Sequence, residues 1–216
     1  MEHTRSLSSL LLESSADIGV LLSAEQVQQF IVYLKQLQLW NKSFNLTNIT
    51  QDEEIIIKHF VDSLAALKAE NMKIGARLLD IGTGAGFPGI PLKIAKWDLH
   101  LTLIEPAKKK TSFLRFIIGR LKLEDIAIFD GTLERFLSER LSDGLFDYVT
   151  TRALKHDMIL EYGRKLLRQG GKVILYSSQP VTSFYLSQNW LLSSQYDFQL
   201  PKGYGQRVIS TIRPSF

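Results

Sequence analysis

One stretch, residues 77–105, constrains the fold of this chain more than any other. It opens with an apolar run (78–81) that leads into a cluster of four glycines, at positions 82, 84, 86 and 89. The pattern then predicts a helix from Gly89 to about Trp97 and a second apolar run (99–104) that ends on an acid. The order strand, glycine loop, helix, strand, acid is typical of the first half of a nucleotide-binding α/β unit.

The glycines and the acid each have a physical reason to be there. Glycine has no Cβ, so the backbone can adopt positive φ and lie close to a ligand. Free N–H groups of the helix that follows point toward the same place. Glu105 lies about 20 residues beyond the loop, where a carboxylate accepts from a free ribose diol and would repel a 2′-phosphate. The alternative is a tight turn that binds nothing, and the agreement of order, glycines and acid argues against it.

The glycine spacing indicates which nucleotide is bound. A dinucleotide site requires G-x-G-x-x-G, but its third glycine position is Phe87 here, and the pattern is G-x-G-x-G. With Asp80 just before it, this spacing resembles the first motif of class I S-adenosylmethionine methyltransferases. Asp80 suits the amine of the cofactor's amino acid tail, and Glu105 suits its ribose. We therefore expect cofactor contacts at Asp80, Glu105, Gly82, Gly84 and Gly86.

Composition narrows the class of protein. A chain of 216 residues, 45% hydrophobic, fits one catalytic domain with a modest extension. Cysteine is absent and the four histidines form no H-x-x-x-H pair, so we expect no metal site. No membrane-length apolar run or signal-like N-terminus is seen, which predicts a cytoplasmic protein, and we expect a monomer. The net charge of +4 permits nucleic-acid binding without requiring it.

Residues 1–75 are expected to form a helical N-terminal extension to a methyltransferase domain at 76–216, the two making one compact unit. A short helix is predicted near 7–12, and a capping box at Ser23–Gln26 opens a helix that runs to about Trp40. A T-x-x-E sequence at residues 50–53 predicts a further helix over 55–68, on which a lone histidine, His59, is more often structural. The amide-rich segment 40–50 is either a set of caps and turns or a presenter of donors and acceptors to RNA bases, with Asn45 and Thr47 as candidates.

The rest of the chain alternates strands and helices, which predicts an α/β fold of the Rossmann-like kind with a mostly parallel sheet flanked by helices. The expected strands are 77–81, 99–104, 126–129, 146–150, 173–176 and 208–212. The expected helices are 89–97, 108–121 with Phe113, Phe116, Ile117 and Leu121 inward, 133–141, 158–167 closed by Gly170-Gly171, and 181–192. Ligands bind at the carboxyl ends of such strands, on a rim made by Gly82, Glu105, residues 130–134 and residues 151–152.

Several motifs occur together and in order: W-N-K-S-F-N-L-T, H-F-V-D-S-L, L-D-I-G-T-G-A-G-F-P-G-I-P-L, K-K-x-x-F-L, E-R-F and F-D-Y-V-T-T-R-A. Over about residues 20–175 the chain thereby resembles the small-subunit ribosomal RNA guanine-N7 methyltransferases, the RsmG/GidB (glucose-inhibited division protein B) family. The resemblance implies S-adenosylmethionine as cofactor, 16S ribosomal RNA as substrate and a cytoplasmic enzyme. It also implies cofactor contacts at Gly82, Phe87, Leu133, Glu134 and Arg152.

Two positions depart from the family pattern. Thr132 stands where the family usually has arginine, and Tyr176-Ser177 stands where it usually has a Lys-Gly pair. If these positions touch RNA, substrate affinity or choice would differ. Arg152 is a candidate for the cofactor or the target base, with a strand-end salt bridge as its structural alternative. Lys42, Lys93, Lys108 and Arg164 are cations that could meet phosphate, although any one of them is more often an ordinary surface charge.

The expected chemistry needs no catalytic side chain. Guanine N7 is a bare acceptor without a proton, so its methylation needs alignment and water exclusion rather than a general base. No convincing catalytic histidine or carboxylate dyad is found in the sequence, and none is assigned. Two alternatives stay open: a class I methyltransferase acting on a protein or small molecule, and a non-catalytic nucleotide-binding module or nicotinamide enzyme. Phe87, in place of the third glycine, argues against a nicotinamide enzyme.

Overall fold

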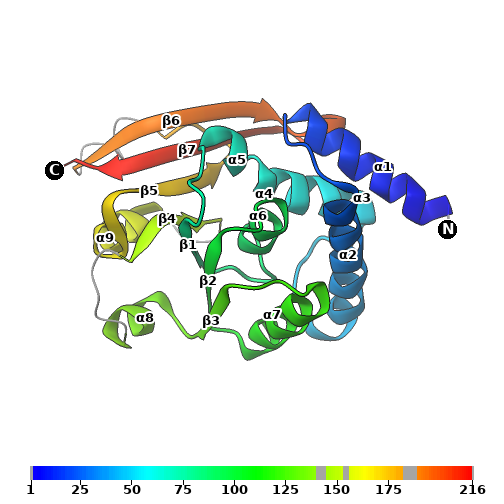
Figure 1. The fold of residues 1–216 in the computed structure, drawn as a ribbon, viewed down its shortest axis with the longest axis horizontal. Coiled ribbons are helices and arrows are strands. Elements are labelled where there is room, and N and C mark those ends of the chain that lie inside the picture. Colours follow the sequence, from blue (N-terminus) through cyan, green and yellow to red (C-terminus); the bar gives the residue numbers. More distant parts are fainter. Residues whose placement is uncertain (1, 140–144, 153–155, 182–188, 216) are drawn as a thin grey trace.

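A computed structural model describes residues 2–139, 145–152, 156–181 and 189–215 of the chain. Within these ranges one seven-stranded sheet, in the order β3-β2-β1-β4-β5-β7-β6, is flanked by helices on both faces (Figure 1). The strands are β1 (Arg77–Ile81), β2 (His100–Glu105), β3 (Ile126–Asp130), β4 (Phe146–Thr151), β5 (Leu167–Ser177), β6 (Trp190–Gln199) and β7 (Gln206–Pro214). The mostly parallel α/β sheet predicted from the sequence is thereby confirmed.

The topology fixes where a ligand can bind. Strands β1 to β5 pair in parallel, so their carboxyl ends share one edge of the sheet. Strand β1 lies between β2 on one side and β4 on the other, and the strand order reverses at that point. In open α/β sheets the crevice outside the carboxyl ends at such a reversal is the usual ligand site. The glycine loop that follows β1 occupies this position.

The N-terminal part is helical but differs in detail from the predicted helices. Helix α1 spans Glu2–Asp17, well beyond the short helix predicted near 7–12, and α2 spans Ala24–Phe44, past the expected end at Trp40. The capping box at the start of α2 is confirmed, because Ser23 and Gln26 exchange both of its hydrogen bonds. The predicted T-x-x-E cap is wrong: α3 (Asp52–Ile55) begins after Gln51, which makes no side-chain cap bond.

The helix predicted over 55–68 is irregular. A π-helical turn, η1 (Ile56–Val61), separates α3 from two short helices, α4 (Asp62–Leu64) and α5 (Ala66–Ala69). Periodicity cannot reveal such a turn, because one extra residue per turn hardly disturbs an apolar run. Single π-helical turns inside helices are frequent at functional sites, and this one carries His59.

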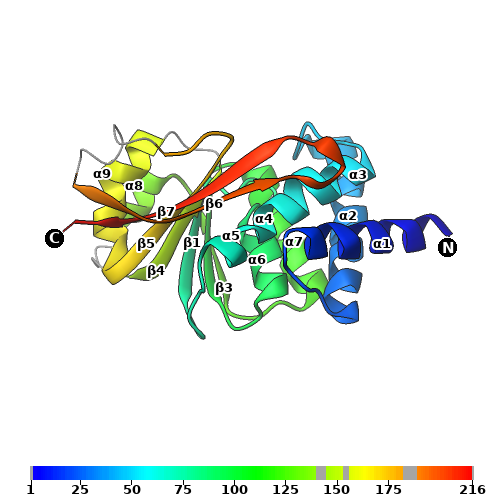
Figure 2. The same ribbon diagram turned by 90° about the horizontal axis from the view of Figure 1, so that it is seen from above.

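Four further helices flank the sheet: α6 (Gly89–Ala95), α7 (Lys108–Leu121), α8 (Leu133–Glu139) and α9 (His156–Leu166). Helices α8 and α9 cover one face, and α6, α7 and the N-terminal helices cover the other (Figure 2). The side chains follow the same division, with one buried cluster on each face. Phe116 of α7, predicted to point inward, is instead 39% exposed. The predicted end of α8, near residue 141, lies outside the described residues.

The C-terminal part holds the largest departure from the predicted elements. Residues 190–192, assigned to a helix over 181–192, begin strand β6, and residues 182–188 lie outside the described ranges. Residues 190–192 form a strand because they pair with β7, and a local apolar run does not reveal such a partner. Strands β5, β7 and β6 pair antiparallel, and a short 3₁₀ turn, η2 (Pro201–Gly203), lies in the β6–β7 connection. The β6–β7 hairpin reaches over the N-terminal helices (Figure 1).

The glycine pair predicted to close α9 lies inside a strand instead. Strand β5 begins at Leu167, directly after α9, and its register against β4 shifts between Phe146 and Tyr148. Gly170 has φ 76°, and a Cβ on Gly171 would lie 2.9 Å from the carbonyl oxygen of Arg168. The pair therefore serves an irregularity in the strand rather than a helix end.

Candidate active site

The glycine loop presents bare backbone at the carboxyl ends of β1 and β2. The N–H groups of Gly82 and Thr83 both donate to the carbonyl of Ile104, at 2.9 and 3.1 Å, which fastens the loop to β2. Gly82, Gly84 and Gly86 have φ of 67°, 63° and 110°, a region that favours glycine. A Cβ built on Gly84 would meet no atom within 4 Å. A ligand can therefore approach the backbone closely at Gly84.

Asp80 holds the loop from inside the protein. Its carboxylate is fully buried, and Oδ2 accepts from the Thr83 hydroxyl at 2.6 Å and from the Gly89 N–H at 2.8 Å. Oδ1 is buried without a hydrogen-bond partner among the described residues. Burial raises the pKa of Asp80 to about 6, against the lowering effect of those two hydrogen bonds. Asp80 thus orders the loop and places a polar, ionisable group behind it.

Glu105 closes the other side of the loop. The side chain is 4% exposed, and its Oε2 accepts from the Gly84 N–H at 2.8 Å while Oε1 accepts from the Ala107 N–H at 2.9 Å. An ionised carboxylate has about four acceptor positions, so each oxygen retains capacity for a further donor. Glu105 therefore shapes the loop and can still accept from two hydroxyl groups.

Helix α2 braces the loop from the N-terminal part. The Tyr33 hydroxyl donates to the carbonyl of Ala85 at 2.5 Å, and the ring is fully buried. A Cβ on Gly86 would lie 2.6 Å from that hydroxyl, so the close approach requires glycine. Phe87 stacks on the Tyr33 ring, with centroids 5.5 Å apart. Tyr33 lies on the buried face of α2 and was not among the residues singled out from the sequence.

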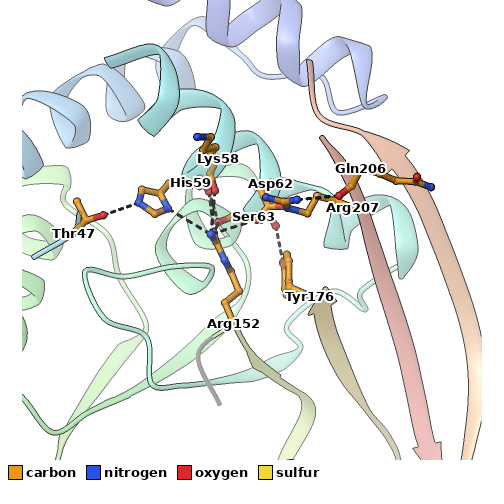
Figure 3. A network of polar contacts seen from close by, with 9 residues as sticks. All are labelled: Thr47, Lys58, His59, Asp62, Ser63, Arg152, Tyr176, Gln206 and Arg207. Carbon is orange, nitrogen blue, oxygen red and sulfur yellow. Dashed lines mark hydrogen bonds and ion pairs between the residues drawn. The ribbon is translucent and has the colours of Figure 1, made fainter. Parts of the chain in front are cut away.

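A polar network joins the N-terminal part to the end of β4 (Figure 3). Arg152, directly after β4, donates to the carbonyl of Lys58 at 3.0 Å and contacts His59 Nδ1 at 3.4 Å. His59 Nε2 lies 2.9 Å from the Thr47 hydroxyl. Both ring nitrogens of His59 therefore lie within reach of a polar partner. The His59 ring stacks on Phe87, with centroids 4.4 Å apart, so the network touches the glycine loop.

Burial keeps His59 neutral. Desolvation first, and the Arg152 charge second, lower its pKa to about 3. The imidazole is therefore uncharged across the physiological range, and both of its nitrogens are engaged. His59 was expected to be structural, and the H-F-V-D-S-L motif was the signal in the sequence that indicated more.

One buried carboxylate organises the arginines of the network. Asp62 Oδ2 lies 3.3 Å from Arg152 and Oδ1 lies 3.6 Å from Arg207 of β7. Burial raises the pKa of Asp62, and the two arginines act against this. Arg152 also receives support from Ser63, whose hydroxyl accepts at 3.1 Å and whose carbonyl accepts from Tyr176 at 2.7 Å. The strand-end salt bridge considered for Arg152 is thus present, with Asp62.

The connection after β3 reaches the same edge. Asp130, the last residue of β3, lies opposite Glu105 in the register of β2 and β3. The Gly131 N–H donates to the Glu105 carbonyl at 3.2 Å. Leu133 is buried at the start of α8, while Glu134 is exposed. Hydrogen bonds from its own N–H and from the Thr132 hydroxyl lower the pKa of Glu134.

Not every sequence candidate lies in this arrangement. Asn45 is exposed and caps α2 in a left-handed conformation, so it stays a candidate RNA contact rather than a member of the network. Lys93 is buried and donates to the carbonyls of Trp97 and Leu99, which excludes it as a phosphate contact. Arg164 donates to the carbonyls of Asn189 and Ser215.

Comparison with known proteins decides the family. The family model described as GidB, rRNA small subunit methyltransferase G, matches residues 26–197, which include the glycine loop, the π-helical turn and Arg152. The chain belongs to this family. Ribosomal RNA small subunit methyltransferase G of Caldanaerobacter subterraneus subsp. tengcongensis is 38% identical over 183 residues, 84% of this chain and 77% of that protein. Ribosomal RNA small subunit methyltransferase G of Lachnoclostridium phytofermentans is 41% identical over 81% of this chain and 72% of that protein.

Solved structures agree on the fold. A SAM-dependent methyltransferase from Aquifex aeolicus superposes with a TM-score of 0.58 at 13% identity, covering 78% of this chain and 96% of that one. This member of the methyltransferase G family is accordingly a class I S-adenosylmethionine-dependent methyltransferase.

The site suits S-adenosylmethionine. Open space at Gly84 admits a ligand against the backbone, and Glu105 keeps acceptor capacity for a ribose diol. The Asp80 carboxylate lies behind the loop and holds it, with Oδ1 buried and unpaired among the described residues. In the described part of the chain, no group of three or more His, Asp or Glu residues could hold a metal ion. None of the described helices is long and apolar enough to cross a membrane.

Proposed function

We propose that this enzyme transfers the methyl group of S-adenosylmethionine to N7 of a guanine in small-subunit 16S ribosomal RNA, as a cytoplasmic monomer. The observation that carries the proposal is the arrangement at the sheet edge, where a glycine loop and Glu105 meet a charged network that offers no free general base. Membership of the methyltransferase G family supplies the substrate class. The polar network around Arg152 includes His59 and Asp62, which cofactor binding alone would not require.

The acceptor's chemistry fits such a site. Guanine N7 carries a lone pair and no proton, so methylation removes no proton from the attacking atom. The bound cofactor supplies an activated methyl group on its sulfonium. The protein's task is to align N7 with that methyl group and to exclude water, contributions that are worth several kcal/mol. Among the buried titratable groups, His59 has both nitrogens engaged and Asp80 orders the loop. Neither is needed as a base.

We assign the remaining residues as follows. Gly82, Gly84 and Gly86 supply the backbone surface for the cofactor, with Phe87 packed behind it. The acids Asp80, Glu105 and Glu134, with Leu133, surround the amino acid tail, the ribose and the adenine. Arg152 pairs with Asp62 and keeps part of its side chain exposed, and we assign it to the cofactor or the target base. Asn45 and Thr47 are assigned to RNA contact.

The two departures from the family pattern have structural roles here. Thr132 accepts from the N–H of Arg135 at 3.3 Å and so caps α8, while Tyr176 supports Ser63. Tyr176 thereby lies next to Arg152, whose guanidinium is 6.0 Å from the centroid of its ring. No observation favours a protein or small-molecule substrate.

The test is methyl transfer from labelled S-adenosylmethionine to small ribosomal subunits and to unmodified 16S ribosomal RNA. We expect label in RNA, recovered as 7-methylguanosine after digestion. Label in RNA at any other atom would refute the N7 assignment. Cofactor binding without label in either RNA preparation would refute the RNA substrate and leave a methyltransferase with another acceptor.

A further inference from the structure

Two segments of the chain are free of acidic residues. Residues 26–51 and 106–123 contain eight lysines and arginines and no aspartate or glutamate. The rest of the chain holds 18 of the 26 basic residues against all 22 acidic ones, so its net charge is negative. The net positive charge of the protein therefore comes from these two segments, which include most of α2 and all of α7.

The fold brings these segments together. Helices α2 and α7 lie side by side (Figure 1), and Gln29 of α2 donates to the carbonyl of Leu121 at 3.3 Å. Both helices lead to the active site: α2 ends three residues before Thr47, and α7 begins three residues after Glu105. The paired outer surface of α2 and α7 is thus a basic face that adjoins the cofactor edge.

Aromatic side chains interrupt this basic face. Trp40 lies between Phe44 and Phe116, with ring centroids at 5.4 and 5.2 Å, and is anchored on buried Phe113 at 5.5 Å. Phe44 and Phe116 are each 39% exposed, and the Lys109 ammonium lies 5.9 Å from the Phe44 centroid. Exposing two phenylalanines costs hydrophobic burial. Contact with Trp40 covers part of each ring and leaves the rest to solvent.

From the conjunction of exposed rings and exposed lysines, we propose that this α2–α7 face binds an unpaired segment of the RNA substrate. Phe44 and Phe116 would stack with bases, while Lys42, Lys108 and Lys109 contact phosphates. Rings and cations interleaved on one surface are the combination that holds single strands, since every base has a π-face and every nucleotide a phosphate. A duplex keeps its bases stacked internally and would engage only the cations. The proposal rests on the proposed function and adds to it the structural class of the RNA.

The experiment compares two sets of variants. One set is Phe44→Ala with Phe116→Ala, which removes the rings but no charge; the other is Lys42→Glu with Lys109→Glu. Trp97→Ala and Lys165→Glu are matched controls, because Trp97 is a 79% exposed aromatic beyond α6 and Lys165 is exposed on α9, across the sheet. Each protein is titrated with a fluorescein-labelled 20-nucleotide single strand of mixed sequence and with the same strand as an RNA duplex. Thermal unfolding and S-adenosylmethionine affinity check that each variant is folded.

The ring variant should bind the single strand about tenfold more weakly or worse, and the duplex as wild type does, because each base stacked on an aromatic ring is worth ~1–3 kcal/mol. The lysine variant should weaken both and flatten the salt dependence, by about 0.7 in the logarithmic slope for each single-strand phosphate that the protein no longer neutralises. In turnover, both should raise KM for RNA and leave cofactor affinity unchanged. Equal single-strand affinity in wild type and ring variant would overturn the proposal.

Two other outcomes separate this proposal from the proposed function. If wild type methylates no RNA yet binds the single strand through the rings, the proposed methyltransferase function is wrong and the proposal for the α2–α7 face is supported. If the variants bind naked RNA normally but lose activity only on assembled subunits, the face contacts protein and the RNA proposal is wrong.

Discussion

Glu105 has two kinds of partner at once. Its oxygens accept from the backbone of Gly84 and Ala107 and retain capacity for ribose hydroxyls. We expect Glu105→Ala to weaken S-adenosylmethionine binding about tenfold or more, because buried donors left unpaired cost ~1–3 kcal/mol. Isothermal titration calorimetry measures this directly. Glu124→Ala, which removes an exposed carboxylate near the opposite end of β3, is the control, and wild-type affinity in Glu105→Ala would exclude ribose binding by this residue.

The depressed pKa of His59 makes folding stability depend on pH. The unfolded chain takes up a proton near pH 6.5, whereas the folded protein does so only near 3. The contribution of His59 to stability is therefore present above about pH 6.5 and is lost as the pH falls toward 3, by ~1.4 kcal/mol per pH unit. Asp80 acts in the opposite sense, since its raised pKa makes stability fall as the pH rises from 3.8 to about 6.

The two effects separate in a comparison of wild type with His59→Gln. Asp80 is present in both proteins and cancels in the difference. The free energy of unfolding of wild type minus that of the variant should grow by ~1.4 kcal/mol per pH unit between about pH 4.5 and 5.5. Urea unfolding followed by circular dichroism gives this slope, with His100→Gln as the control for the loss of one imidazole. A constant difference across this range would contradict a buried, neutral His59.

At the scale of elements, the glycine loop contains two positions with similar backbone but different surroundings. Gly84 and Gly86 both have positive φ, yet a Cβ on Gly84 meets open space while one on Gly86 meets Tyr33 and Ile90 at 2.6 Å. Gly84→Ala should cost only ~1 kcal/mol of stability but should reduce cofactor affinity strongly, because the methyl group enters the ligand's space. Gly86→Ala should lower the melting temperature much further, since the bracing helix must move.

Thermal unfolding and cofactor titration of both variants test this contrast. If Gly84→Ala binds the cofactor as wild type does, the open space at Gly84 is not the cofactor's. If Gly86→Ala is as stable as Gly84→Ala, the contact with α2 does not constrain the loop.

The sequence predicted the elements whose pattern is local. Helix α7 and strand β1 have the predicted bounds, and the loop and Glu105 meet as expected, because glycine spacing and apolar runs carry that information. Strand β6 was missed because its partner, β7, lies beyond a turn. Tyr33, Asp62 and Arg207 come to the site from outside the α/β pattern, through tertiary contacts that periodicity does not encode. The position of Phe116, against Trp40 of α2 and partly exposed, depends on such a tertiary contact too.

At the scale of the whole molecule, the N-terminal helices and the sheet share one interior. The buried cluster on the α7 face joins side chains of α1, α2 and η1 to those of β1, β2 and α7. Tyr33, Phe60 and Phe87 pack ring to ring across that boundary. The β6–β7 hairpin adds bonds from the other end of the chain, where Ser194 donates to the carbonyl of Ala69 at 3.0 Å. We therefore propose that residues 1–75 and 76–216 unfold as one cooperative unit.

Two tryptophans report on the two parts separately. Trp40 lies in α2, and Trp190, fully buried, lies in β6 at the far edge of the sheet. In one variant Trp97 and Trp190 become phenylalanine, and in the other Trp97 and Trp40 do, so that each protein retains a single fluorescent probe. Within each variant, the guanidinium unfolding curve from fluorescence should coincide with that from far-ultraviolet circular dichroism, which follows the whole backbone. Saturating S-adenosylmethionine should shift both curves together, because a ligand bound at the sheet edge stabilises every part of a two-state protein equally. A Trp40 transition that precedes the circular dichroism curve and ignores the cofactor would show instead that the N-terminal helices unfold on their own.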